Sequence, residues 1–148
     1  MYWALHEPEK AREYLELAYQ DGIKNHNILS VQMSLMNLAE TEAEMQQYES
    51  ALEKYNKAEV IAREQDFRYQ HSNILANKAR LQSNLGNHTE ALRIYKEALA
   101  VVENYNLATQ LPNLLTLQAQ TYIELKEHDR AISILNEAIP LAKKNEAK

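Results

Sequence analysis

Histidines are the side chains best suited to acid–base chemistry or metal ligation near neutral pH, and the chain has five of them. They are His6, His26, His71, His88 and His128. His88 and His128 lie forty residues apart at equivalent places in the sequence, which indicates copies of one structural position. Glu124 lies four residues before His128, but a turn expected between them would break the helical face that they would need to share. No third or fourth ligand follows by spacing, so we predict no metal site.

Known catalytic signatures are also missing from the sequence. It has no glycine-rich phosphate loop, no Gly-x-Ser-x-Gly and no His-Glu-x-x-His, and it has no cysteine. Its carboxylates are scattered over positions expected to face solvent. We therefore predict a protein that is not an enzyme, with no catalytic residues and no cofactor.

A row of amide side chains is the better candidate for a functional surface. Asn73, Asn77, Arg80 and Asn84 follow one another at offsets of four, three and four, so they form one stripe on a helix. Amide side chains both donate and accept hydrogen bonds, which suits the backbone of an extended peptide. The alternative is an ordinary solvated helix face. The equivalent stripes forty residues away hold Met33, Asn37, Glu40 and Glu44, and Asn113, Leu117, Gln120 and Glu124.

The elements that would position this row repeat with a period of forty residues. Three series stand in strict register: Ala11, Ala51, Ala91 and Ala131; Ala18, Ala58, Ala98 and Ala138; and, between them, Leu15, Tyr55, Tyr95 and Leu135. A fixed period of this size is typical of a solenoid, in which each unit buries its apolar face against its neighbours.

Each repeat reads as two helices. Few glycines and prolines, with abundant Ala, Leu, Glu, Gln and Lys, predict an all-helical chain. The apolar periodicity places helices at about Pro8–Asp21, Asn27–Gln46, Tyr48–Gln65, Tyr69–Leu85, His88–Tyr105, Thr109–Leu125 and His128–Lys144. Their short joints predict antiparallel neighbours.

Glycine and proline mark the expected helix boundaries. Gly22 is expected to stop the first helix, while Pro8 and Pro112 fit the opening turns of theirs. Pro140 falls inside the last helix, where it removes a backbone hydrogen bond and clashes with the carbonyl of Asn136. We expect a kink or an early end there.

Composition bounds the partner and the compartment. The net charge of −5 and the pI near 5.6 argue against direct nucleic-acid binding. No apolar run is long enough for membrane insertion, and residues 1–13 lack the apolar core of a signal peptide. The absence of cysteine suits the cytoplasm and is compatible with the periplasm, so we expect a cytoplasmic protein.

Paired helices with this alanine and aromatic spacing resemble the tetratricopeptide repeat. The small residue in the first helix of the family's repeat corresponds to Ala39, Ala79 and Ala119, and its turn glycine is kept only at Gly86. The family's helix-ending proline is replaced by Arg63, Glu103 and Lys143. The usual period is thirty-four residues; the longer period looks like that of kinesin light chains and of bacterial regulatory and sensor proteins.

The resemblance implies a right-handed superhelical solenoid of about seven helices. It predicts one array over residues 1–148, with a half repeat at 1–24 and full repeats at about 27–66, 67–106 and 107–146. The half repeat at the front and the uncapped last helix suggest a fragment of a larger protein.

By the same resemblance, the concave surface is formed by the first helix of each pair and binds partners. The expected partner-binding residues are Asn37, Asn73, Asn77, Arg80, Asn84, Asn113 and Gln120. A clamp for the C-terminal carboxylate of chaperones is not expected, because only Asn77 matches its residue set and Glu40 would repel a carboxylate.

Three functions remain open. The leading one is a protein- or peptide-binding scaffold or sensory module of a larger, bacterial-type signalling or regulatory protein. The second is self-association into a homodimer through the solenoid ends, with Tyr2, Trp3 and Leu5 at one end and Ile132, Leu135 and Ile139 at the other. The third is a regulator whose superhelix closes around a small peptide.

Overall fold

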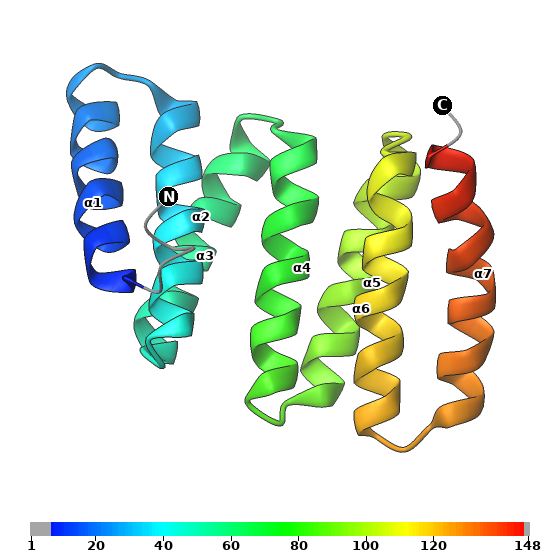
Figure 1. Ribbon diagram of the computed structural model, residues 1–148. Helices are drawn as coiled ribbons and strands as arrows, with labels where there is room; N and C mark the ends of the chain where they lie inside the picture. The colour runs from blue at the N-terminus through cyan, green and yellow to red at the C-terminus, as the bar shows by residue number, and fades with distance from the viewer. Residues whose placement is uncertain (1–6, 147–148) are drawn as a thin grey trace. The chain divides into compact units, whose positions relative to one another are not determined.

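The structure is a computed structural model that describes residues 7–146, and every regular element in this range is helical. The helices are α1 (Pro8–Lys24), α2 (Ile28–Glu44), α3 (Tyr48–Glu64), α4 (Arg68–Asn84), α5 (His88–Asn104), the short 3-10 helix η2 (Ala108–Gln110), α6 (Leu111–Glu124) and α7 (His128–Glu146) (Figure 1). The predicted all-α fold of seven antiparallel helices is confirmed. The predicted boundaries differ from the observed ones by a few residues, and the segment predicted as the start of the sixth helix is the separate turn η2.

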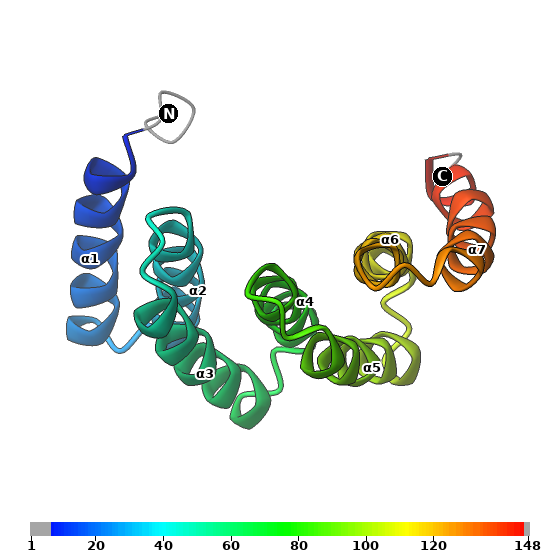
Figure 2. The ribbon, with the colours of Figure 1, turned by 90° about the horizontal axis from the view of Figure 1, so that it is seen from below.

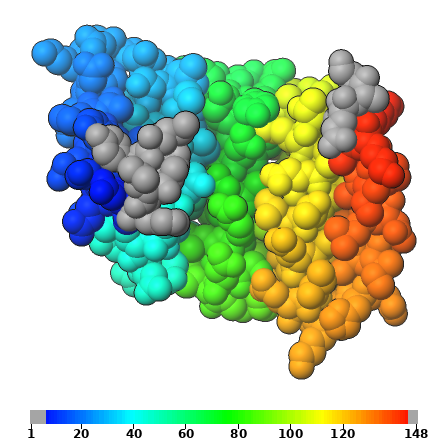
Figure 3. Space-filling model, in the orientation of Figure 1, coloured from blue at the N-terminus to red at the C-terminus, as the bar shows by residue number. Residues whose placement is uncertain are grey.

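The chain divides into two compact units, Met1–Gln70 and His71–Lys148, with the boundary in the first turn of α4. In the N-terminal unit, α2 lies between α1 and α3 (Figure 2). In the C-terminal unit, α5 packs on α4 and α6, and the side chains of α6 and α7 meet along both helices (Figure 3). None of the helices within residues 7–146 combines the length and the apolar character needed to cross a bilayer.

Six turns with one geometry connect the seven helices. Each has a residue with positive φ, and these residues lie twenty positions apart: His26, Gln46, Asp66, Gly86, Asn106 and Lys126. At the turn after α2, the Gln47 N–H donates to the Glu42 carbonyl at 2.8 Å and the Gln46 N–H donates to the Ala43 carbonyl at 3.0 Å. This is the Schellman pattern, which satisfies the last carbonyls of a helix and requires a left-handed residue. Because only Gly86 is free of the steric cost of that conformation, five of the six turns are strained by their residue type.

Gly22 does not end the first helix, contrary to expectation. α1 continues to Lys24, and Gly22 is a buried residue inside it. A Cβ at this position would lie 3.1 Å from Val31 Cγ2 and 3.2 Å from the Val31 backbone nitrogen. Glycine therefore allows α1 and α2 to approach closely, while His26 is the left-handed residue that ends the helix.

Two of the three prolines stand where they were expected. Pro8 and Pro112 each occupy the first turn of their helix. The prediction that the last helix ends early at Pro140 is wrong, since α7 runs on to Glu146. Proline lacks one N–H, and the hydrogen bonds of the neighbouring turns carry the helix past it.

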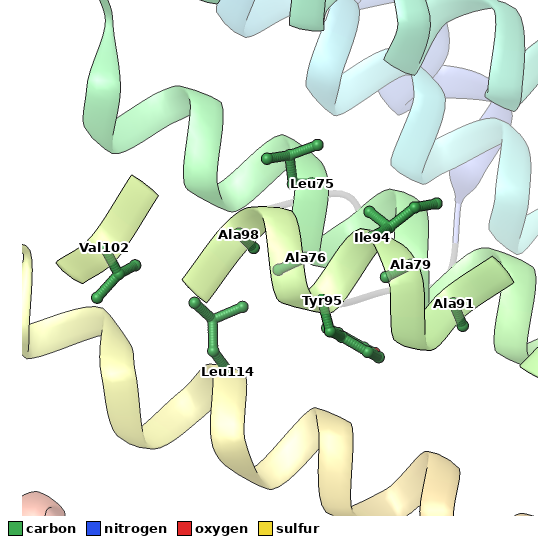
Figure 4. Packing of buried hydrophobic residues seen from close by; sticks show 9 residues of the cluster. All are labelled: Leu75, Ala76, Ala79, Ala91, Ile94, Tyr95, Ala98, Val102 and Leu114. Atoms are coloured by element: carbon green, nitrogen blue, oxygen red, sulfur yellow. The ribbon is translucent and has the colours of Figure 1, made fainter. Parts of the chain in front are cut away.

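The alanines of the forty-residue register are buried in both units, except for the exposed Ala18 on α1. Ala51, Ala58, Ala91 and Ala98 are fully buried, and Tyr55 and Tyr95 between them are each 1% exposed. In the C-terminal unit, Tyr95 belongs to a buried cluster that also contains Leu75, Ile94 and Leu114, from α4, α5 and α6 (Figure 4). Alanine lets the backbones approach, and the bulky residue fills the remaining space.

Lys126→Gly should raise the free energy of unfolding by about 1 kcal/mol, because glycine adopts the left-handed turn without the steric cost that lysine has. The matched control is Lys96→Gly, which makes the same change in the exposed middle of α5 and should lower it by about 1 kcal/mol. Urea unfolding measures both. Two changes of the same sign would contradict the turn assignment.

Candidate functional site

The predicted row on α4 divides into residues that hold the fold and residues that face outward. Asn73 is half-buried, and its Oδ1 accepts a hydrogen bond from Gln110 Nε2 at 3.0 Å. Asn77 is half-buried, while Arg80 and Asn84 are exposed. The exposed part of the row is thus Arg80 and Asn84, with Asn77 partly accessible on the same stripe.

Gln110 is the residue that engages the Asn73 side chain in a hydrogen bond within the fold. This glutamine is 7% exposed, comes from η2, and is also hydrogen-bonded through Oε1 to the hydroxyl of the buried Ser72. The two contacts join α4 to the start of α6. Sequence reasoning missed them because Gln110 lies at a turn, where its polarity alone indicates solvent exposure.

The other predicted groove residues lie on α6 and α2. Asn113 and Gln120 are exposed on α6, in the C-terminal unit. Asn37 is half-buried on α2, in the N-terminal unit. The structure thus leaves the α6 pair accessible on the same unit as Asn77, Arg80 and Asn84.

Asn37 lines a pocket of about 290 Å³ between α1 and α2. The lining residues are Ala11, Leu15, Asn37, Glu40, Thr41 and Glu44. The α1 wall is apolar and the α2 wall is polar and acidic. Glu40 and Glu44 appeared in the sequence only as neighbours of the row, and the contribution of α1 was not predicted.

A network of polar side chains runs from the core of the C-terminal unit, at Tyr95, Thr121 and Ser83, to the exposed Glu124. The hydroxyl of Tyr95 is hydrogen-bonded to Thr121, and Thr121 Oγ1 donates to Ser83 Oγ at 3.1 Å. Ser83 in turn donates to Glu124 Oε2 at 3.1 Å and lies 3.1 Å from His88 Nδ1. The network links α4, α5 and α6.

Ser83, His88 and Glu124 are the residue types of a hydrolytic catalytic triad, but their hydrogen bonds are arranged differently. Ser83 is 5% exposed and directs its proton to the carboxylate, and His88 Nδ1 also lies 3.4 Å from Glu124 Oε2. A nucleophilic serine needs access to substrate and a base that takes its proton. This cluster instead joins three helices.

Metal ligands do not gather in the described part of the chain. Between residues 7 and 146, no three His, Cys, Asp or Glu side chains lie close enough together to hold an ion.

Only the α7 half of the predicted self-association surface lies within the described residues. Ile132 and Ile139 on α7 are 56% and 52% exposed, and Leu135 between them is half-buried. The other half of the prediction, Tyr2, Trp3 and Leu5, lies outside the described residues.

A comparison with sequence families places these features in a known context. The tetratricopeptide repeat profile matches residues 30–104 and 72–144, which overlap and span most of the chain. This chain belongs to the tetratricopeptide repeat family. The family forms protein–protein interaction scaffolds that are generally non-catalytic. No curated protein sequence matches it.

Solved structures show the same repeat fold. Aspartyl phosphate phosphatase F from Bacillus subtilis matches with a TM-score of 0.88 and 21% identity over 98% of this chain. A kinesin light chain-like protein from Podospora anserina, with nearly identical TPR-like repeats, matches with a TM-score of 0.78 and 17% identity over 99% of this chain. The tetratricopeptide chain spans 38% of the length of the first protein and 72% of the second.

The buried network predicts a loss of stability at high pH. Burial raises the pKa of Tyr95 from 10.0 to about 12, against a smaller opposing effect of its hydrogen bond to Thr121. Between these pH values the unfolded tyrosine ionises while the native one keeps its proton, so the free energy of unfolding falls as pH rises. Below pH 10 the contribution is fully present.

Urea unfolding of the wild type and of Tyr95→Phe at several pH values tests this. The variant should lose about 1 kcal/mol at pH 7 with the hydroxyl hydrogen bond, and should then depend less on pH between 10 and 12. Other tyrosines are present in both proteins and cancel. Parallel profiles over that interval would contradict the assignment.

Proposed function

We propose that this tetratricopeptide domain is a peptide- or protein-binding module of a larger signalling or regulatory protein, with no catalysis of its own. The observation that carries the proposal is the division of polar side chains on α4 and α6. Ser72, Ser83 and Thr121 make buried contacts between helices, whereas Arg80 and Asn84 are exposed on α4 and Asn77, on the same stripe, is half-buried.

An outward row of amides and a guanidinium matches the hydrogen-bonding groups of a peptide backbone. Amides supply a donor and an acceptor, and the guanidinium supplies donors for carbonyls or carboxylates. Asn113 and Gln120 on α6 extend this surface within the C-terminal unit, and Asn37 is its counterpart in the N-terminal unit.

The similarity to a Bacillus subtilis aspartyl phosphate phosphatase supports a regulatory setting in a bacterial protein. The kinesin light chain-like protein supports a scaffolding role. Both similarities concern the fold, so the partner must be found by experiment. We expect the module to act in the cytoplasm.

Selection of random dodecapeptides displayed on phage against the purified chain tests the proposal. Fluorescence anisotropy should give micromolar affinities for selected peptides, and Asn77→Ala/Arg80→Ala should weaken binding at least about tenfold, since it removes two hydrogen-bonding groups. The control Lys96→Ala/Asn104→Ala removes the same two kinds of group from exposed positions on α5 and should leave affinity unchanged. Failure to select peptides, or equal binding by both variants, would contradict the proposal.

Self-association is the second candidate, and the exposure of Ile132 and Ile139 on α7 favours it. Adjacent exposed isoleucines on a terminal helix leave apolar surface that a second copy can bury.

Light scattering after size exclusion, at several concentrations, tests the α7 surface. A homodimer that dissociates in Ile132→Lys/Ile139→Lys is expected, because lysine replaces the apolar contact with a charge. Ile123→Lys, at a 44% exposed position on α6, should remain dimeric. A wild-type monomer at every concentration would exclude this function.

A further inference from the structure

The pocket between α1 and α2 lies beside a register position that holds different residues in the helix pairs α1/α2 and α5/α6. In the C-terminal unit, Tyr95 on α5 is 1% exposed and its hydroxyl is hydrogen-bonded to Thr121 on α6. The corresponding pair in the N-terminal unit is Leu15 and Thr41. Leucine is smaller and has no hydroxyl, and about 290 Å³ remains open beside it.

The two walls of this pocket differ in chemistry. Ala11 and Leu15 on α1 form an apolar wall. On α2, the Thr41 hydroxyl donates to the Asn37 carbonyl at 2.9 Å and is thereby committed to its own helix. The wall also holds the carboxylates of Glu40 and Glu44 and the amide of Asn37, so it is rich in acceptor atoms, and none of the six lining residues is basic.

The net charge of the N-terminal unit also favours a cationic partner. Residues 1–70 contain 13 acidic and 7 basic side chains, whereas residues 71–148 contain 8 and 9. The acidic excess of the whole chain therefore lies in the part that contains the pocket. A cationic partner would be attracted to this unit before it made any specific contact.

We propose that this pocket receives a single lysine or arginine side chain of a partner peptide. The aliphatic stem lies against Ala11 and Leu15, and the charged end lies between Glu40 and Glu44. Long basic side chains bury their methylene groups on apolar surface in this way. The inference rests on the peptide-binding function proposed above and specifies the partner residue that the N-terminal unit recognises.

The volume of the pocket suits a single amino-acid side chain better than a larger ligand. Sites for small molecules occupy roughly 300–1,000 Å³, and this pocket is at the lower limit. A divalent cation is a poorer occupant, since calcium takes about six to eight oxygen ligands and no such group of acidic side chains gathers among residues 7–146.

NMR titration of the full chain with four blocked pentapeptides tests the proposal. The probes are acetyl-Ala-Ala-X-Ala-Ala-amide, with Lys, Arg, Glu or Met as X. The lysine and arginine peptides should shift the amide resonances of pocket residues in a saturable way. Binding by the methionine peptide with equal affinity would overturn the proposal, because it would show that the carboxylates contribute nothing.

Leu15→Tyr tests the pocket without changing its charge. The ring should fill the space as Tyr95 does in the other unit and weaken binding of the lysine peptide at least about tenfold. The control Leu17→Tyr makes the same substitution on the same helix, at a 66% exposed residue outside the pocket, and should bind as wild type. Thermal melts establish that both variants fold. Wild-type binding by a folded Leu15→Tyr variant would overturn the proposal.

A second pair of variants tests the carboxylates, and it remains informative if Leu15→Tyr does not fold. Glu40→Gln/Glu44→Gln should weaken binding of the lysine peptide at least about tenfold. Glu53→Gln/Glu64→Gln removes the same charge from exposed positions on α3 and should have a much smaller effect. Equal losses would mean that the peptide follows net charge alone, and would overturn the pocket.

The two proposals fail in different ways. If selected dodecapeptides depend on Asn77 and Arg80 while no pentapeptide shifts the pocket resonances, the peptide-binding function stands and the pocket proposal is wrong. If basic pentapeptides bind the pocket while selection against the C-terminal row fails, the pocket stands and the row is wrong.

Discussion

Close contact between helix backbones at alanine is the constraint on which this structure depends. Ala51 and Ala91 are fully buried where one helix meets the next, and Gly22 serves the same purpose between α1 and α2. A larger side chain at these points would push the helices apart and open the core along the repeat. The strict forty-residue spacing of small residues follows, since each repeat must present the same close surface to its neighbour.

The residue between the alanines is where the repeats gain individual properties. Tyr95 fills its site and adds a hydrogen bond, so α5 and α6 enclose a buried polar network. Leu15 at the same register lines a pocket with an acidic wall. The same register position thus contributes to a structural contact in one helix pair and to a candidate recognition site in another. Repeat proteins typically share one structural frame and differ in recognition at single positions.

Polar residues divide in the same manner. The buried Ser72 is hydrogen-bonded to Gln110 and the buried Thr121 to Ser83, because a polar group removed from water is costly without a partner. The N-terminal unit has a partly buried ion pair, in which Lys54 Nζ lies 2.7 Å from Glu42 Oε1. These contacts hold helices in place.

The sequence by itself determined the repeat family, the number of helices and the buried face of each, because a helix has a fixed period and the alanine series reports it directly. It also offered Asn77, Arg80 and Asn84 on α4 as candidate binding residues, which stays a prediction. The tertiary structure decided that Asn73 serves Gln110, that Gly22 lies inside its helix, and that α1 and α2 enclose a pocket at Leu15. Those outcomes depend on distances between residues on different helices. A periodic pattern in the sequence indicates which face of a helix is buried, but it does not say which side chains of other helices pack against that face.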